Sequence, residues 1–197
     1  AGLARLETTV LVCEGGLMDG GRAVVRIVTR HQAAAKPHGI TCTSLYTIDS
    51  DGIVDVVNTV VMDHQLPAVA RVGMRVGLMS AFETLSWFGR GPHESYPDRK
   101  ASALVGRYQS TVNAQFFPFV DPCECGGHED TRHLCLADAA GNGLQVSSDQ
   151  RFHFSALHYT QEDLLQAGHV YELSPTGDVQ LCVDGYHMGL GGDTGWS

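Results

Sequence analysis

Cysteines and histidines gather between residues 123 and 135, and residues of these two types could hold a zinc ion. Cys123, Cys125 and His128 follow the pattern C-x-C-x2-H, and His133 and Cys135 follow H-x-C. Thiolate sulfurs and imidazole nitrogens are the usual ligands of structural zinc. The common C-x2-C spacing is absent, however, and H-x-C places both side chains on one face only where the strand is regular. We therefore expect a surface loop beside a strand, and no stoichiometric zinc.

The stretch at residues 87–99, W-F-G-R-G-P-H-E-S-Y-P-D-R, combines apolar, turn-forming and polar residues. Trp87 and Phe88 should end a strand in the core. Three residues after them favour a sharp turn, because glycine reaches positive φ and proline fixes φ: Gly89, Gly91 and Pro92. A polar cluster follows: Glu94, Tyr96, Asp98 and Arg99. We predict a structured corner in which Arg99 pairs with a carboxylate of its own loop or with Glu124.

The end of the chain, residues 184–196, reads D-G-Y-H-M-G-L-G-G-D-T-G-W and is rich in glycine. Trp196 closes this loop. An indole ring is a flat apolar surface on which the C–H face of a sugar can stack, and it can equally fill a protein core. On the residues alone, both interpretations of Trp196 stay open.

These two stretches resemble a known family. G-P-x-E-x-Y-x-D-R after a tryptophan strand, followed at the far end by the 184–196 motif, resembles the C-terminal domain (the fifth, or small-chain, domain) of the large β-galactosidases of glycoside hydrolase family two. A third match is the family's P-x-E-x-G followed by T-R, which is met here by Pro122, Glu124, Gly126, Thr131 and Arg132. Cys123 and Cys125 fall at its variable positions, which supports the loop over the zinc site.

The resemblance is colinear over residues 1–197, and the family domain extends further on both sides. It implies that this chain is a fragment: a single β-sandwich domain with the large antiparallel supersandwich fold of galactose mutarotase. It also implies a cytoplasmic, retaining β-galactosidase that hydrolyses lactose and related β-galactosides. The family's matching tryptophan forms part of the platform for the sugar or aglycone beyond the galactose, and we assign that role to Trp196.

The same resemblance implies which components lie elsewhere. The family's catalytic glutamates belong to a separate barrel domain, so no catalytic residue is expected in this chain, which alone should be inactive. No cofactor or metal is expected in this fragment, whereas full-length members use Mg²⁺ and a monovalent cation at other domains. The expected partners are the β-galactoside substrate, the catalytic barrel domain of the same chain and, for the full-length enzyme, further copies in a homo-oligomer.

The carboxylates of the chain agree with this expectation. A retaining glycosidase needs an acid and a nucleophile about 5 Å apart, and an inverting one needs a wider pair. The glutamates are Glu7, Glu14, Glu83, Glu94, Glu124, Glu129, Glu162 and Glu172. None lies at the end of a barrel-type strand, and the βαβ alternation of a (β/α)8 barrel is missing. We interpret Glu94 and Glu124 as structural ion-pair partners of Arg99 and Arg132.

Histidines offer an alternative function. A mutarotase uses a histidine and a glutamate as general acid and base, and four histidines lie in the second half of the fold: His153, His158, His169 and His187. No motif here recreates that pair. A free-standing mutarotase or epimerase, and a non-catalytic carbohydrate-binding sandwich, therefore remain the alternatives to the β-galactosidase domain.

The elements that must position these residues are almost all strands. Alternating and β-branched segments predict strands at residues 3–13, 22–30, 40–48, 53–62, 69–79, 82–88, 132–136, 144–148, 152–159 and 179–184. An aromatic segment at 115–120 suits an edge strand because it contains Pro118. Residues 14–21, 31–39 and 122–133 should be loops, and 101–109 a connecting segment. Residues 160–167 predict the one short helix, with Thr160 as N-cap.

Composition excludes some partners and compartments. The formal net charge is −9, which disfavours nucleic acid and anionic membranes as partners. No apolar run approaches the roughly 20 residues of a membrane-spanning helix. The N-terminus alternates like a strand and is no signal peptide. The six cysteines have no regular spacing, so we expect reduced thiols.

Overall fold

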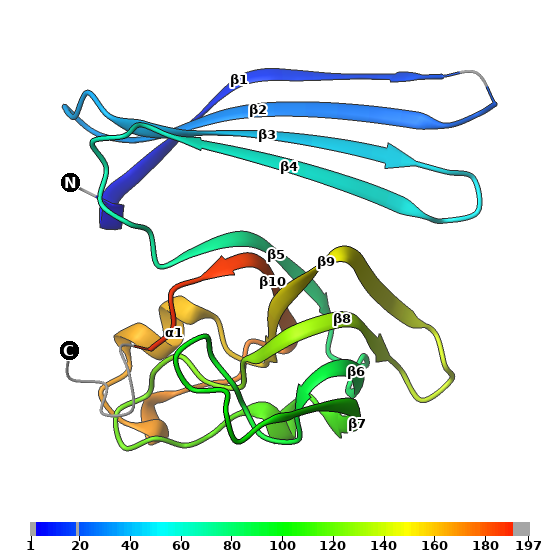
Figure 1. The fold of residues 1–197 in the computed structure, drawn as a ribbon, viewed down its shortest axis with the longest axis vertical. Coiled ribbons are helices and arrows are strands. Elements are labelled where there is room, and N and C mark those ends of the chain that lie inside the picture. Colours follow the sequence, from blue (N-terminus) through cyan, green and yellow to red (C-terminus); the bar gives the residue numbers. More distant parts are fainter. Residues whose placement is uncertain (1–2, 19, 191–197) are drawn as a thin grey trace. The chain divides into compact units, whose positions relative to one another are not determined.

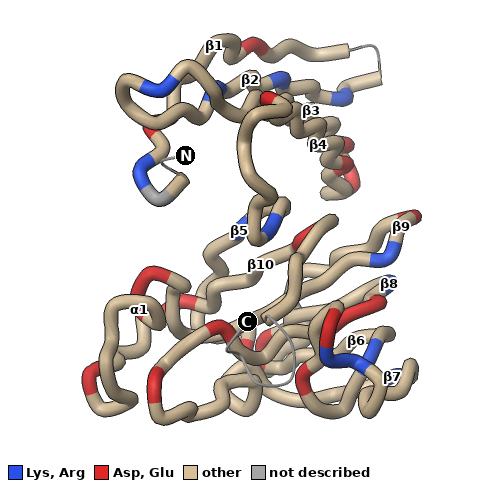
Figure 2. Tube along the Cα trace, turned by 60° about the vertical axis from the view of Figure 1, so that its left-hand side comes forward, with Lys and Arg blue, Asp and Glu red and all other residues tan. Residues whose placement is uncertain are grey.

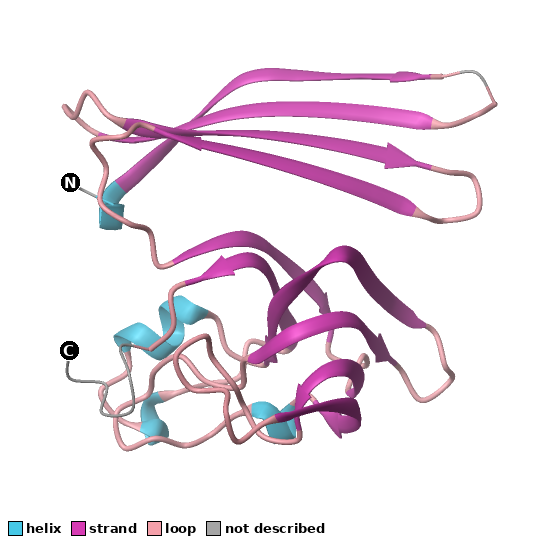
Figure 3. Cartoon of the chain, viewed as in Figure 1, coloured by secondary structure: helices cyan, strands magenta, loops and turns pink. Residues whose placement is uncertain are grey.

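The computed structural model describes residues 3–18 and 20–190 (Figure 1). The chain divides into two compact units, unit one at Ala1–Ala68 and unit two at Val69–Ser197. Each unit holds one antiparallel sheet, and the only helices described are short (Figure 3). The prediction of an all-β chain is therefore confirmed, and the single domain over 1–197 stays a prediction. No helix in the described residues is long and apolar enough to cross a membrane.

Unit one is a four-stranded meander. Its strands are β1 (Leu6–Leu17), β2 (Ala23–Ala33), β3 (Gly39–Ile48) and β4 (Val54–Met62), in the spatial order of the sequence, after a 3-10 turn η1 (Leu3–Arg5). Consecutive antiparallel strands need only short connections, and each connection here is a short loop. Gly52, at φ +89°, lies in the β3–β4 loop, where the run Asp49-Ser50-Asp51-Gly52 predicts a hairpin turn with glycine at positive φ.

Unit two is a six-stranded sheet with the order β5-β10-β9-β8-β6-β7. The strands are β5 (Arg71–Met79), β6 (Thr84–Gly91), β7 (Leu104–Thr111), β8 (His128–Ala137), β9 (Gly143–Leu157) and β10 (Asp178–His187). Two 3-10 turns, η2 (Asn113–Gln115) and η3 (Val170–Glu172), and the helix α1 (Gln161–Gln166) complete it. The last strand thus enters the sheet between β5 and β9, so residues from both ends of unit two are neighbours.

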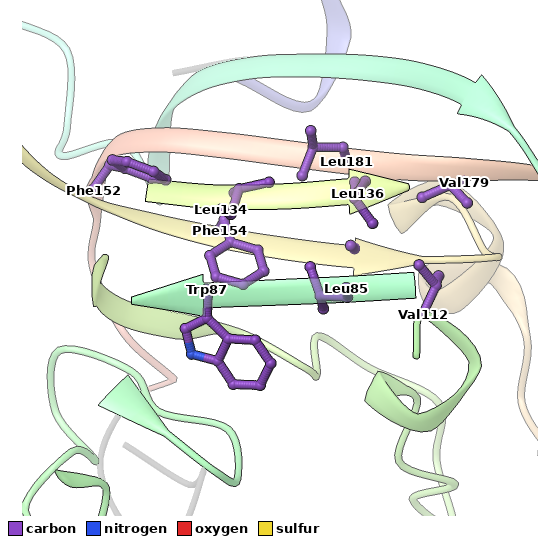
Figure 4. Packing of buried hydrophobic residues seen from close by; sticks show 10 residues of the cluster. Leu85, Trp87, Val112, Leu134, Leu136, Phe152, Phe154, Val179 and Leu181 are labelled. Carbon is purple, nitrogen blue, oxygen red and sulfur yellow. The ribbon is translucent and has the colours of Figure 1, made fainter. Parts of the chain in front are cut away.

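The core of unit two lies on one face of this sheet (Figure 4). Period-two alternation sends Leu85 and Trp87 of β6 to that face, where both are almost fully buried. The indole ring of Trp87 packs on the rings of His128 and Phe154, at centroid distances of 4.3 and 6.0 Å. The remaining core residues come from β8, β9, β10 and the loop after β7: Val112, Leu134, Leu136, Phe152, Ala156, Val179 and Leu181.

Several predicted boundaries are wrong. β1 continues through the expected loop to Leu17, and β2 continues to Ala33, because both hairpins extend beyond the apolar segments that indicate them. The predicted strands 144–148 and 152–159 are one strand, β9. Its pairing with β8 shifts register between Thr131, which faces Phe152, and His133, which faces Ser147, and the extra residues of this irregularity lie on β9. The expected connecting segment 101–109 contains β7, an edge strand whose exposed residues give a weak pattern.

Residues 115–120 form no strand; instead their aromatic rings pack against a second buried cluster. Phe116 and Phe119 contact the cluster of Cys125, Leu157 and Leu164. The helix is as predicted. Thr160 accepts a hydrogen bond from the Asp163 backbone N–H at 3.0 Å, and the Asp163 carboxylate accepts one from the Thr160 N–H at 2.9 Å. These two bonds form a capping box.

The corner at residues 87–99 is present, but its glycines serve packing rather than turning. Gly89 and Gly91 lie inside β6, and neither has positive φ. A Cβ atom on Gly89 would lie 2.9 Å from the Thr131 Cα, and one on Gly91 would lie 2.7 Å from the Tyr108 ring. The chain turns after the cis peptide bond between Gly91 and Pro92. Close approach of the neighbouring strands therefore explains both glycines.

Ion pairs hold the corner together. Arg99 donates to the Glu94 carboxylate, which confirms that it pairs within its own loop. Arg90, which sequence reasoning missed, donates to the Asp130 carboxylate at 2.5 Å and to the carbonyl oxygens of Lys100 and Ala103 at 3.1 and 2.8 Å. In Figure 2 acidic residues are spread over both units, and in unit two several of them lie beside arginines in this way.

The predicted pairing of Arg132 with Glu124 is wrong. Arg132 follows a register shift in β8, and its guanidinium donates to the Asp130 carbonyl oxygen at 2.6 Å and lies 5.0 Å from the centroid of the Phe88 ring. Phe88 thus packs under arginine side chains, on the face of β6 opposite Trp87. Glu124 pairs with another arginine, described below.

Removing the corner arginines should destabilise unit two in a defined order. Arg90→Ala should cost about 3 kcal/mol, because it leaves Asp130 and two carbonyl oxygens without their partner. Arg99→Ala should cost about 1–2 kcal/mol, below the 2–5 kcal/mol expected of a buried pair, because the Arg99 side chain is 37% exposed. The matched control is Arg75→Ala on β5, whose ion pair with Glu162 is exposed, with a loss of less than about 1 kcal/mol. Urea unfolding gives all three values, and equal losses would refute the order.

Cys125 should resist alkylation in the native protein. Its thiol is fully buried, and burial raises its pKa to about 11, so little thiolate is present near neutral pH. Exposed Cys13 provides the internal control and should react at once. Peptide mass spectrometry after iodoacetamide treatment measures both. Fast labelling of Cys125 without unfolding would show that the loop before β8 is open.

Candidate functional site

Three side chains of unit two converge in a way that their positions in the sequence do not suggest. Glu124 lies in the loop before β8, His153 on β9, and His187 at the end of β10. One potential ligand atom of each lies within 4.8 Å of the others. The sheet order explains this, since β10 pairs with β9 at Asp184 opposite His153. We refer to Glu124, His153 and His187 as the polar triad.

His153 is buried with one nitrogen unpartnered. Its side chain is 2% exposed, and its Nδ1 lies 2.9 Å from the Glu129 carboxylate. A carboxylate only accepts, so Nδ1 carries the proton and Nε2 presents a lone pair. Nε2 has no hydrogen-bond partner, the one such buried side-chain atom among the described residues. Buried polar atoms are nearly always satisfied, so this nitrogen indicates a missing ligand or water.

His187 stacks on His153, with ring centroids 4.5 Å apart and an angle of 29° between the planes. Its Nδ1 accepts a hydrogen bond from the Gly189 N–H at 3.0 Å. Burial, together with the positive charge of Arg71, lowers the pKa of His187 to about 4. His187 is therefore neutral near pH 7, with its proton on Nε2.

Glu124 and Asp184 share one arginine. Arg71 donates to the Glu124 carboxylate at 3.1 Å and also to the Asp184 carboxylate, which is almost fully buried. Gln161 of α1 donates to the same Glu124 oxygen at 3.0 Å. Burial raises the pKa of Glu124, and Arg71 opposes that shift. Burial likewise disfavours the charge of Arg71, but the hydrogen bond to Asp184 and the charges of both carboxylates raise its pKa above its ordinary value.

Gly73 on β5 makes room for this network. A Cβ atom there would lie 2.1 Å from Asp184 Oδ1. From the sequence, Gly73 and Gly77 on one face of this strand suggest either close packing or a solvent-exposed face that must bend. Close packing is confirmed for Gly73, whereas a Cβ atom on Gly77 would meet nothing within 4 Å.

The corner of residues 87–99 contacts the start of the glycine-rich end of the chain. The ring of Tyr96 contacts both His153 and His187, at centroid distances of 5.3 and 5.4 Å. The Asp98 carboxylate accepts the Leu190 N–H at 2.9 and 3.1 Å. Gly189, at φ +95°, packs on the same carboxylate. The two stretches that the sequence singles out thus meet in space, while Trp196 lies outside the described residues.

The cysteine and histidine group that opened the sequence analysis does not assemble. Cys125 is buried, whereas Cys123 is exposed. His128 is held by the Arg90 carbonyl oxygen at 3.1 Å and by Gln115 Oε1 at 2.7 Å, so both ring nitrogens are engaged. All six cysteines are free of disulfides.

Sequence reasoning named all members of the polar triad but did not group them. The available signal was a charged or ionisable residue where an apolar one is expected: His153 stands in F-H-F-S, on a strand segment buried on both faces. The remaining predicted residues take structural places. Trp87 is in the core, Gly91 packs against Tyr108 at the end of β6, Pro92 precedes the turn, and Glu94 and Arg99 pair with each other.

A separate pocket of about 380 Å³ opens beside the corner. Its walls combine aromatic rings with polar groups: Pro92, His93, Glu94, Arg99, Ser110, Ala114, Gln115, Phe116, Phe117, Phe119 and Gly126. Next to Glu124, in contrast, the cavity has only about 10 Å³, room for one water molecule.

Comparison with known proteins gives a consistent answer. Residues 6–197 match the family model of the β-galactosidase small chain. The chain is 41% identical over 181 residues to a β-galactosidase of Vibrio cholerae, covering 92% of this chain and 17% of the relative. It is 38% identical over 156 residues to a β-galactosidase of Aeromonas hydrophila, covering 77% of this chain and 14% of the relative. It is 34% identical over 198 residues to a β-galactosidase of Enterobacter cloacae, covering 100% of this chain and 18% of the relative.

This chain spans less than a fifth of the length of these relatives. The matched segment contains the corner, the polar triad and the glycine-rich end together. On the match to the family model and on these identities, the chain belongs to the β-galactosidase small-chain family.

Proposed function

We propose that this chain is the C-terminal domain of a cytoplasmic, retaining β-galactosidase that hydrolyses lactose and related β-galactosides. In that enzyme it contributes a wall of the site for the sugar or aglycone, and the catalytic carboxylates come from a barrel domain of the same polypeptide. The observation that carries the proposal is the contact between the corner and the end of the chain. The carboxylate of Asp98 and the ring of Tyr96 fix the segment that leads to Trp196.

The described carboxylates support a role without acid–base catalysis. Glu124 and Asp184 are both bound to Arg71. Glu129 is bound to His153 and Lys100, and Glu94 is bound to Arg99. A retaining glycosidase needs one carboxyl group free to protonate the leaving group and one free to attack. Buried carboxylates that are already committed to cations meet neither need.

The geometry favours this role over a free-standing mutarotase. A mutarotase needs its histidine and glutamate to open on a cavity that holds a whole sugar. The cavity beside Glu124 has room for one water molecule, and the larger pocket is lined by neither His153 nor His187. The larger pocket keeps the carbohydrate-binding alternative open, since aromatic rings beside polar side chains suit a sugar.

For the full-length enzyme we further propose a homo-oligomer. Its Mg²⁺ and monovalent cation would be bound by other domains, as the family resemblance implies. The partner of this domain within the chain would be the catalytic barrel.

The isolated chain should hydrolyse no β-galactoside, because two free and correctly spaced carboxyl groups are indispensable to the reaction. A chromogenic galactoside assay of the purified chain tests this, with the full-length enzyme as positive control. Turnover that persists through repeated purification would refute it.

Trp196→Ala in the full-length enzyme should raise KM for lactose about 2- to 12-fold, since an aromatic stacking contact contributes about 0.5–1.5 kcal/mol. Galactosides with larger aglycones that contact the ring should be affected most, while kcat for small activated galactosides changes little. Trp196→Phe is the matched variant, because it keeps an aromatic surface and should recover part of the loss. Wild-type steady-state kinetics for Trp196→Ala would remove the substrate-binding role.

A further inference from the structure

We propose that the polar triad of Glu124, His153 and His187 binds a divalent transition-metal ion of the zinc type. The inference does not depend on the proposed function, because it rests on side chains within unit two. It also differs from the cysteine and histidine group at 123–135, for which no zinc is expected.

The donor set suits zinc. Two imidazoles and one carboxylate are the protein ligands of many zinc sites, which keep a further position for water. Bonds of about 2.1 Å place the ligands of a tetrahedral ion about 3.4 Å apart. The potential ligand atoms lie within 4.8 Å of one another. Small side-chain rotations, which bring the most distant pair closer by no more than about 1.4 Å, would therefore complete the site.

His153 is already oriented as metal-binding histidines are. Its Nδ1–H donates to the Glu129 carboxylate at 2.9 Å, which fixes the ring and leaves the Nε2 lone pair free. A carboxylate behind the imidazole is the usual second contact of a metal-bound histidine. A metal ion at Nε2 would satisfy the unpartnered buried nitrogen, which nothing else in the described residues does.

Charge around the triad also favours a cation. Three carboxylates lie near the site, each on a different element of the fold: Glu124, Asp184 and Glu129. Two positive charges oppose them, Arg71 on β5 and Lys100 beside Glu129. Glu124 uses only one of its oxygens for Arg71 and Gln161, so the other oxygen can take a metal while the ion pair persists.

Metal binding would be coupled to the end of β10. His187 Nδ1 accepts the Gly189 N–H. If the metal binds at Nδ1, it takes that lone pair; if it binds at Nε2, a neutral imidazole must carry its proton on Nδ1. In both cases the Gly189 hydrogen bond is lost. Loading the site would therefore release the backbone just before Leu190, which Asp98 holds.

The test compares zinc content in the full-length protein that contains this chain. The protein is stripped with chelator, dialysed against micromolar zinc with Mg²⁺ and Na⁺ in excess to keep other sites filled, and analysed for metals. Wild type should retain one more zinc ion per chain than His153→Gln and Glu124→Gln. The matched control is His158→Gln. The His158 ring is bound to Glu83 and is not part of the polar triad, so this variant should leave the zinc content unchanged. Equal zinc in wild type and His153→Gln would overturn the site.

Two measurements on wild type keep the proposal falsifiable if a variant fails to fold. X-ray absorption at the zinc edge should show scattering from two imidazoles, and a spectrum with sulfur ligands would overturn the assignment. Hydrogen–deuterium exchange should become faster in the peptide that contains Gly189 when zinc is added. Zinc binding without that change would remove His187 from the ligand set and so refute the proposed triad. A wild type that binds no zinc would refute it as well, since a water molecule would then be the partner of the His153 nitrogen.

Discussion

Unit two depends on the positive charge of Arg71. This one guanidinium binds Asp184 of β10 and Glu124 of the loop before β8, and so joins three segments that lie far apart in the sequence. Asp184 is almost fully buried, and a buried carboxylate without its cation would be strongly destabilising. The network therefore selects one register for β10 beside β5, and Gly73 is required because any side chain there would collide with Asp184.

The consequences of this ion pair extend to the end of the chain. β10 carries Asp184 in its middle and His187 at its end, so fixing the first also places the second against Tyr96 and His153. The corner fixes the residues that follow β10, because both oxygens of the Asp98 carboxylate accept the backbone N–H of Leu190. A polar corner in this position needs no catalytic explanation, since its side chains set the path of the backbone up to Leu190.

The same arrangement leaves one feature that structural stability does not account for. A buried histidine nitrogen without a partner is unfavourable, and a hydrophobic side chain at this position would bring no unsatisfied polar atom. The buried carboxylate of Glu129 accepts the Nδ1–H of His153 and so orients that ring. An arrangement with this cost is more typical of a site than of a packed interior.

The elements whose signals are local could be predicted from the residues alone. Period-two alternation located most strands, the capping residues located α1, and the two motifs identified the family. For Arg99 the sequence left two partners open, a carboxylate of its own loop or Glu124, and the structure selects Glu94. The folded structure was needed to show where β7 and β9 run, that Glu124 pairs with Arg71 rather than Arg132, and that Glu124, His153 and His187 meet. The physical reason is the sheet order β5-β10-β9-β8-β6-β7: hydrogen bonds between strands distant in sequence create these contacts, and no local pattern encodes which strand will be the neighbour.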